Sequence, residues 1–202
     1  MRGAGACLEV CVDYPITNGI RQRPTNPDRL GILNTLAQSQ YIAKGSQLDV
    51  LEIGSLFGDS ARILGRYGHV MCVDMWDWEG GLQTFLSNTA HLSVDHCQGD
   101  SREILLHLKD EAYDLIYIDG GHTYPIVDLD IHEAKRLIKP GGIICGDDLE
   151  KQASSLDDYN EAEKLRTIDY IDGYHPGVTC AVFRELGYVN NEAGLWWKVI
   201  ST

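Results

Sequence analysis

The stretch LDVLEIGSLFGDSA, residues 48–61, decides the fold class of this chain. Its first part is a short apolar run that ends at Gly54, and such a run is typical of a strand buried inside a parallel sheet. Gly54 and Gly58 flank a turn, after which a helix is expected to begin near Asp59 or Ser60. A buried strand, a glycine turn and a helix in this order indicate an α/β fold.

The same alternation of apolar runs and amphipathic segments continues to about residue 149. Four further strands are expected, at residues 69–76, 94–100, 113–120 and 142–149. Helices are expected before and between the strands, at residues 25–45, 58–68, 81–92, 101–112 and 125–139. The pattern predicts a single Rossmann-like domain with an open, mostly parallel sheet flanked by helices. Such sheets bind ligands at the carboxyl ends of their strands.

The two flanks of this core are less regular. Residues 1–25 are expected to be irregular because prolines and glycines interrupt them, and Asn26 is the expected N-cap of the first helix. Residues 26–149 are the expected cofactor-binding core. Residues 150–202 begin with a polar, loop-rich part that ends near residue 176 and continue with a short helix and a closing strand. The polar part is either a lid that recognises substrate or a solvated loop.

Composition narrows the function. With 202 residues, 44% of them hydrophobic and 23% charged, the chain has the size and composition of one soluble globular domain. The net charge of −13 repels a phosphate backbone, which disfavours a nucleic-acid partner and favours a small molecule or a sugar. No stretch approaches the roughly 20 apolar residues of a membrane span, and the N-terminus is a weak match for a signal peptide. We therefore expect no membrane partner.

The cysteines indicate a reducing compartment. Six cysteines occur without a C-x-x-C pair, so reduced structural thiols are expected, as in the cytoplasm. Cys72 and Cys145 lie inside apolar runs and are expected to be small core residues.

Acids at the ends of the first three strands suit a nucleoside with a cationic tail. Glu52 precedes a G-x-x-x-G turn, which differs from the G-x-G-x-x-G of dinucleotide folds and suits an amino-bearing or cationic ligand such as S-adenosylmethionine. Asp74 ends the second strand, where an acid accepts hydrogen bonds from ribose hydroxyls. Asp100 follows the third strand and would accept from an adenine amine, cap the next helix together with Glu103, or do both.

A second group of acids follows the fourth and fifth strands. If these strands are neighbours, Asp119, Asp147 and Asp148 meet at one edge of the sheet, and their repulsion requires a compensating cation. Oxygen ligands favour a hard ion such as Mg²⁺, whereas a polar turn is the alternative for Asp147 and Asp148. Asp128 and Asp130 are expected to be solvated acids near the start of the following helix.

At this point the residues resemble a known family. In order, the segments VLEIGSLFGDSA, VDMW, GDSREIL, LIYIDGGHTY and LIKPGGIICGDD are similar to class I S-adenosylmethionine-dependent methyltransferases. Within that class they most resemble metal-dependent O-methyltransferases related to catechol O-methyltransferase and to sugar O-methyltransferases of antibiotic pathways. The resemblance covers roughly residues 26–149 and is specific in the combination of motifs, while the flanks match poorly.

The resemblance implies a role for each motif. The turn after the first strand would hold the methionine end of the cofactor, through Glu52, Gly54, Ser55, Gly58 and Ser60. Asp74 would bind the ribose, and Asp100 with Ser101 would contact the adenine. A divalent metal would be ligated by Asp119, Asp147 and Asp148.

Two positions depart from the catechol enzymes. Those enzymes have Asp-Asn where this chain has Asp147-Asp148, and a catalytic lysine where this chain has His122, as in the sugar-modifying relatives. The expected mechanism has the metal, held by Asp119, lower the pKa of a substrate hydroxyl while His122 removes the proton. His175 is a competitor for the role of the base.

The expected function is methyl transfer from S-adenosylmethionine to a hydroxyl of a small molecule such as a sugar or natural product. A metal-independent N- or macromolecule methyltransferase and a non-catalytic cofactor-binding relative are the alternatives. Trp196 and Trp197 serve either the core or an interface, which leaves a homo-oligomer open, and a core position is favoured for at least one of them.

Overall fold

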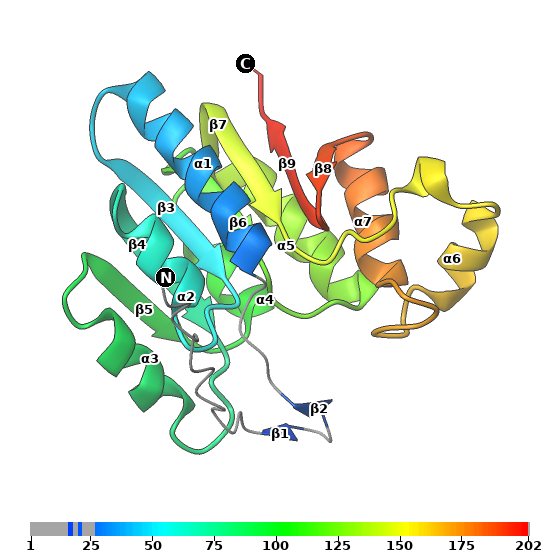
Figure 1. Ribbon diagram of the computed structural model, residues 1–202, viewed down its shortest axis with the longest axis horizontal. Helices are drawn as coiled ribbons and strands as arrows, with labels where there is room; N and C mark the ends of the chain where they lie inside the picture. Colours follow the sequence, from blue (N-terminus) through cyan, green and yellow to red (C-terminus); the bar gives the residue numbers. More distant parts are fainter. Residues whose placement is uncertain (1–15, 18–19, 22–26, 202) are drawn as a thin grey trace, which may run out of the picture.

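The computed structural model describes residues 16–17, 20–21 and 27–201, and these contain a seven-stranded sheet (Figure 1). The strand order is β5-β4-β3-β6-β7-β9-β8. Five neighbouring strands run parallel: β5 (Val94–Gln98), β4 (Gly68–Asp74), β3 (Leu48–Ile53), β6 (Tyr113–Ile118) and β7 (Ile138–Gly146). The hairpin of β8 (Asn190–Glu192) and β9 (Leu195–Val199) joins antiparallel to β7. The predicted open, mostly parallel sheet is therefore confirmed.

Helices cover both faces of the sheet (Figure 1). One face packs against α1 (Pro27–Lys44), α2 (Asp59–Leu64) and α3 (Gly81–Thr89). The other packs against α5 (Tyr124–Leu137), α6 (Tyr159–Leu165) and α7 (Pro176–Leu186). Alternate residues of β6 serve the two cores: Leu115 and Tyr117 face the first group of helices, and Ile116 and Ile118 face the second. Central strands buried on both faces account for their near-continuous apolar sequence.

The winding of the sheet reverses at β3, which pairs with β4 on one side and β6 on the other. The hydrogen-bond ladder continues past the strand ends, where Gly54 N–H donates to the Val73 carbonyl at 2.8 Å and Asp119 N–H to the Ile53 carbonyl at 2.7 Å. Asp147 N–H donates to the Ile118 carbonyl at 3.0 Å. The residues that follow β3, β6 and β7 are thereby held side by side at one edge of the sheet.

One helix is shorter than its pattern predicts. A helix was expected over residues 101–112, but α4 covers Ser101–Ile104 and a short 3-10 helix covers Leu105–His107. The reason lies in α5, where the Arg136 guanidinium donates to the carbonyls of Leu105 at 2.8 Å and Leu108 at 2.9 Å. Because a side chain satisfies these carbonyls, no further helical turn is needed.

The flanking segments differ in part from expectation. Within residues 150–176 a 3-10 helix (Ala153–Ser155) and α6 precede α7, so this part is more ordered than a polar loop. β1 (Ile16–Thr17) and β2 (Ile20–Arg21) form an antiparallel pair in a segment expected to be irregular. The expected N-cap Asn26 and the cysteines at 7 and 11 lie outside the described residues.

The core assignments of cysteine and tryptophan are confirmed. Cys72 and Cys145 are fully buried. Trp196 is buried and its indole N–H donates to the Asp147 carbonyl at 3.1 Å, while Trp197 is half-buried. Among the described residues, no helix combines the length and apolarity needed to cross a membrane.

Asp130 was wrongly predicted to be a solvated acid. Its side chain is fully buried, and among the described residues its only polar neighbour of note is the Ser101 hydroxyl, which opposes the effect of burial on its pKa without forming a hydrogen bond of ordinary geometry. The helix starts at Tyr124, so Asp130 lies beyond the first turn and shares the buried stripe of Val127 and Ala134. Burial raises the pKa of Asp130 to about 7. Asp128, on the same helix, is half-buried.

This buried acid predicts a specific pH dependence of stability. The pKa of Asp130 is higher in the folded than in the unfolded chain, so the native state binds more protons and its stability falls as pH rises through about 4 to 7. Asp130→Asn removes this titration. Between pH 5.5 and 8.5 the free energy of unfolding of the variant should gain about 2 kcal/mol relative to the native chain. Urea unfolding at the two pH values measures the gain.

The exposed Asp157 supplies the control. Asp157→Asn should shift the free energy of unfolding equally at both pH values. A difference between Asp130→Asn and the native chain that does not change with pH would contradict the assignment.

Candidate active site

A cleft of about 1240 Å³ lies at the carboxyl edge of the parallel strands. It exceeds the roughly 300–1,000 Å³ of most ligand pockets, so it has room for a nucleoside-bearing cofactor together with a second substrate. Ten of the predicted site residues line it: Gly54, Ser55, Ser60, Asp74, Asp100, Ser101, Asp119, His122, Asp147 and Asp148. Glu52 and Gly58 do not line it.

Gly54 allows the loop after β3 to pack directly against the backbone that follows β6. Its φ is 85°, and a Cβ at this position would lie 2.0 Å from the carbonyl oxygen of Asp119. Any side chain would therefore collide with the backbone that follows β6. Only glycine combines this left-handed conformation with that contact.

Asp74 organises the two loops that follow β3 and β4 in the cleft. Its Oδ2 accepts from the N–H groups of Ser55 and Leu56, both at 2.9 Å, and its Oδ1 accepts from Trp76 N–H at 2.8 Å. Leu56 and Trp76 have positive φ values of 44° and 38°. Since a carboxylate has about four acceptor positions, Asp74 keeps capacity for a ribose hydroxyl after holding these strained loops.

Glu52 lies beneath the cofactor loop and outside the cleft. The hydroxyl of Ser55 donates to Glu52 Oε2 at 2.7 Å, and the Cys72 thiol lies 3.1 Å from the same oxygen. The side chain is fully buried, and burial raises its pKa. The geometry thus gives Glu52 a positioning role through Ser55, instead of the direct contact with the cofactor that the sequence suggested. Gly58 is the N-cap of α2.

Asp100 lines the cleft and also caps a helix. It is the N-cap of α4, where Oδ1 accepts from Arg102 N–H at 2.9 Å, and its carboxylate pairs with the Arg102 guanidinium. The hydrogen bonds from Arg102 lower the pKa of Asp100. Capping by Asp100 is thus confirmed. The part expected of Glu103 in the cap and the contact of Asp100 and Ser101 with adenine stay predictions.

At the other end of the cleft, an arginine joins the predicted metal ligands. Nη1 of Arg29 lies 2.6 Å from Asp147 Oδ1 and 2.9 Å from Asp148 Oδ1. Arg29 belongs to α1, and its Nε also donates to the Ala193 carbonyl at 2.8 Å. Nothing in the sequence pattern indicated this residue, because it is 119 positions away from Asp148.

The pKa values show that these carboxylates interact. Burial, and then the charges of Asp147 and Asp148, raise the pKa of Asp119 well above its usual range. Burial and Asp148 raise the pKa of Asp147 to about 6, against the opposing effect of Arg29. Asp148 behaves differently: burial would raise its pKa, but His122 outweighs burial and holds the pKa below its usual range.

The three predicted metal ligands already have a compensating cation. The sequence argument required a cation to compensate three acids, and the Arg29 guanidinium already lies on two of them. The third, Asp119, accepts from the Tyr117 hydroxyl at 3.2 Å. The charge argument for a metal ion therefore loses its basis, and ligation of Mg²⁺ by Asp119, Asp147 and Asp148 stays a prediction.

His122 lies between two carboxylates. Its Nε2 is 3.0 Å from Asp148 Oδ2, and its Nδ1 is 3.0 Å from Asp169 Oδ1. Burial lowers the pKa of His122, but hydrogen bonds to the two acids outweigh burial and raise the pKa to about 10. The imidazole therefore holds a proton at neutral pH. Asp169 was missed in the sequence, because it lies in the polar segment where no motif was recognised.

His175, a predicted competitor of His122, lies next to it. The two imidazole centroids are 4.5 Å apart, and His175 Nδ1 is 3.1 Å from Glu150 Oε2. Both rings line the outer end of the cleft with Asp169 and Tyr170. The segment 150–176 thus contributes side chains to the cleft, and its role as a lid that recognises substrate stays a prediction.

Comparison with known proteins decides the family. Residues 51–149 match the family model of a methyltransferase domain. This stretch is a methyltransferase domain, and the chain resembles the class I S-adenosylmethionine-dependent methyltransferases. The matched region contains the glycine turn, Asp74, Asp100 and the acids at the ends of β6 and β7, so the motifs that carried the resemblance lie within the methyltransferase domain.

Solved structures share the fold of this methyltransferase. TomG, an O-methyltransferase of tomaymycin synthesis from Streptomyces achromogenes in complex with S-adenosylmethionine, has 17% identity and a TM-score of 0.63, with 89% of this chain and 82% of TomG covered. An O-methyltransferase from Bacillus cereus in complex with SAH has 22% identity and a TM-score of 0.61, with 87% and 82% covered. CalS11, a TDP-rhamnose 3′-O-methyltransferase of calicheamicin biosynthesis, has 14% identity and a TM-score of 0.60, with 88% and 80% covered. No curated protein matches the sequence.

The close approach at Gly54 yields a prediction for this methyltransferase. Gly54→Ala should lower the free energy of unfolding by about 2–4 kcal/mol, because the methyl group overlaps the Asp119 backbone and the residue has a positive φ. It should also weaken binding of S-adenosylmethionine at least about tenfold, since the loop lines the cleft. Urea unfolding and calorimetric titration measure the two effects.

Gly141→Ala is the matched control, because Gly141 has a φ of 80° but open space around its Cβ position. It should lose about 1–2 kcal/mol from backbone strain alone and keep cofactor affinity. Equal losses of stability in the two variants would show that the contact with Asp119 has no effect.

Proposed function

We propose that this methyltransferase transfers the methyl group of S-adenosylmethionine to a hydroxyl oxygen of a small molecule. The observation that carries the proposal is the composition of the cleft, which has a glycine turn and Asp74 at one end and an acid–imidazole cluster at the other. The first end suits the cofactor, and the second offers proton acceptors for a hydroxyl. Solved O-methyltransferases of the same fold support an oxygen acceptor.

Charge favours a small acceptor over a nucleic acid. The chain has a net charge of −13, and Asp119, Asp147, Asp148 and Asp169 line the cleft. A phosphate backbone would be repelled there, whereas the sulfonium and ammonium groups of the cofactor would be attracted. A neutral alcohol, sugar or phenol would bind beside the cofactor without such a penalty.

The chemical step needs alignment and a proton acceptor. The substrate oxygen attacks the methyl carbon in line with the carbon–sulfur bond, and the electron pair of that bond stays on sulfur, which leaves a neutral thioether. The backbone around Gly54 and the loops tied by Asp74 would fix the cofactor for this attack. Holding the two reactants in line supplies much of the acceleration in such reactions. The hydroxyl proton passes to a basic group of the protein.

Two residues are candidates to accept the proton of the substrate hydroxyl. The sequence indicates His122, but each of its ring nitrogens already lies 3.0 Å from a carboxylate, so it accepts a new proton only after the one shared with Asp148 has moved. Asp147 lines the same end of the cleft. Its Oδ1 contacts only Arg29 and the N–H of Asp148 among the described residues, which leaves its other oxygen able to accept.

Loss of the proton acceptor should slow methyl transfer without weakening cofactor binding. Either His122→Gln or Asp147→Asn should lower kcat about 10²–10⁴-fold, with the Kd for S-adenosylmethionine changed less than about threefold. The loss should be larger for an aliphatic alcohol than for a phenol, because the more acidic hydroxyl depends less on a base. Single-turnover assays with paired substrates, together with calorimetric titration of the cofactor, measure these quantities.

His69→Gln is the control, since His69 is exposed and pairs with Asp95 away from the cleft. Absence of cofactor binding in the native chain would refute the proposed function. Transfer to amines but to no hydroxyl in a matched panel would refute the oxygen acceptor. Unchanged kcat in both variants would remove both residues from the proton step.

A further inference from the structure

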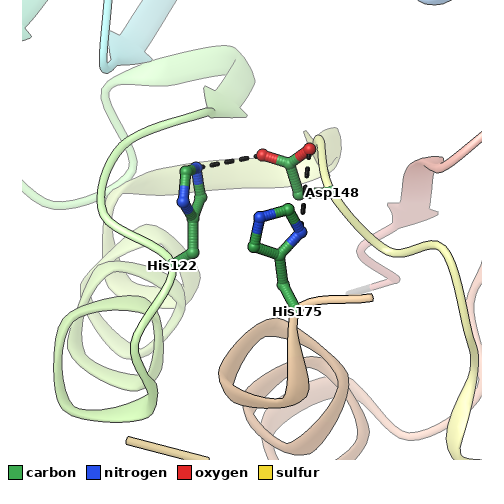
Figure 2. Close-up of side chains that lie close together, drawn as sticks. All are labelled: His122, Asp148 and His175. Atoms are coloured by element: carbon green, nitrogen blue, oxygen red, sulfur yellow. Dashed lines mark ion pairs between the residues drawn. The ribbon is translucent and has the colours of Figure 1, made fainter. Parts of the chain in front are cut away.

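Three side chains at the outer end of the cleft converge on one point. His122, Asp148 and His175 each offer a ligand atom, and these atoms all lie within 4.8 Å of one another. Figure 2 shows the two imidazoles side by side with the Asp148 carboxylate spanning both. The measured separations are 3.0 Å from Asp148 Oδ2 to His122 Nε2 and 3.9 Å from Asp148 Oδ1 to His175 Nδ1.

The three residues come from separate parts of the fold, and each is held in place. His122 lies between β6 and α5, Asp148 follows β7, and His175 is the N-cap of α7. Their side-chain exposures are 30%, 16% and 11%, so they are shielded from bulk water but open to the cleft. Asp148 has a φ of 62°, a left-handed conformation that strains a non-glycine residue and is common at functional sites.

Each imidazole also has a carboxylate partner outside the trio. Asp169 Oδ1 lies 3.0 Å from Nδ1 of His122, and Glu150 Oε2 lies 3.1 Å from Nδ1 of His175. For His122 the two acids lie on different ring nitrogens, and a carboxylate on the nitrogen that faces away from the ion is typical of metal sites, where it orients a ligating histidine and raises its basicity. For His175, Glu150 lies on the same Nδ1 that faces Asp148, so this acid does not hold the ring from behind. Two imidazoles with centroids 4.5 Å apart would repel each other if both were protonated, whereas a shared cation between them and Asp148 removes that repulsion.

We propose that His122, Asp148 and His175 bind a divalent transition-metal ion such as Zn²⁺, Mn²⁺ or Fe²⁺. Two imidazole nitrogens and one carboxylate form the donor set of catalytic zinc sites and of non-haem iron sites, which keep positions open for substrate or water. Mg²⁺ prefers oxygen donors only and is disfavoured here. The ion would take the place of the proton between His122 and Asp148. This set shares only Asp148 with the three-aspartate set expected from the resemblance.

The position of the ion also suggests its use, and this part rests on the proposed function. The trio lines the same cleft as the loops that follow β3 and β4, and the methyl acceptor would lie there beside the cofactor. A bound ion there would lower the pKa of a substrate hydroxyl, and Asp147 lies beside it in the chain as a proton acceptor. Asp169, which touches no ligand atom of the ion, would act as a positioning residue through His122.

Direct metal titration tests the proposal. The full-length chain, freed of metal with a chelator, is titrated calorimetrically with Zn²⁺, Mn²⁺ and Mg²⁺, and with Co²⁺ by visible absorption. We expect one equivalent of Zn²⁺ bound at least about 100-fold more tightly than Mg²⁺, and a Co²⁺ spectrum typical of nitrogen and oxygen ligands. Binding of Mg²⁺ as tight as that of Zn²⁺, or no Zn²⁺ binding above that of the ligand variants, would overturn the proposal.

Variants separate this set from the three-aspartate set. His122→Gln and His175→Gln should each weaken Zn²⁺ binding at least about 100-fold, Asp169→Asn about 10–100-fold, and Asp147→Asn less than about threefold. His132→Gln is the control, because His132 is an exposed histidine of α5 with 70% side-chain exposure. The opposite order, in which Asp147→Asn abolishes binding and His175→Gln does not, would overturn the proposal in favour of the three aspartates.

Cofactor binding is measured on the same samples, so failures of the two proposals stay distinct. S-adenosylmethionine binding and methyl transfer without specific Zn²⁺ binding would refute only the metal site. Specific Zn²⁺ binding without methyl transfer would refute only the proposed function. Retained cofactor affinity in His122→Gln or Asp169→Asn also shows that the variant is folded, which makes its loss of metal affinity interpretable.

Discussion

The contact between the backbones of Gly54 and Asp119 is the constraint on which the site depends. β3 has parallel neighbours on both sides, and the chain leaves it toward β4 but returns to its other side as β6. The two exits lie so close that a Cβ on Gly54 would be 2.0 Å from the Asp119 carbonyl oxygen. That approach places Asp119 beside the cofactor loop. It also sets the distance between the ends of β3 and β6. Asp147 follows β7, the next strand of the sheet, and is held against the end of β6 by its N–H bond to the Ile118 carbonyl.

The charges of the site also tie distant parts of the chain together. The outer end of the cleft gathers acids from β6, β7 and the 150–176 segment, and Arg29 meets two of them from the first turn of α1. The same guanidinium donates to the carbonyl of Ala193 between β8 and β9. Removing it would leave carboxylates uncompensated in a partly buried site, which is costly. The first helix, the β7 edge and the last hairpin are therefore linked through the acids that also serve the site.

Sequence reasoning succeeded where the signal is local. Strands and glycine turns depend on residues that are neighbours in the sequence. The sequence therefore predicts β3, β4, β6 and β7 and the acids that follow them. Arg29 and Asp169 were not predicted, because only the folded topology brings them to the cleft. The burial of Asp130 has another explanation. Its spacing from Val127 and Ala134 places it on the buried face of the helix, and this helical period determines its burial although the side chain is acidic.

The excess of carboxylates in the cleft also affects the reaction as it proceeds. S-adenosylmethionine brings a sulfonium to a cleft lined by several carboxylates, and this attraction contributes to binding. Methyl transfer turns the sulfonium into a neutral thioether, while the hydroxyl proton stays at the acidic end and neutralises one carboxylate or is passed to solvent. Both changes weaken the attraction between the cleft and the spent cofactor. An acidic site therefore favours the sulfonium form of the cofactor over the thioether form, and this difference assists release of the product form.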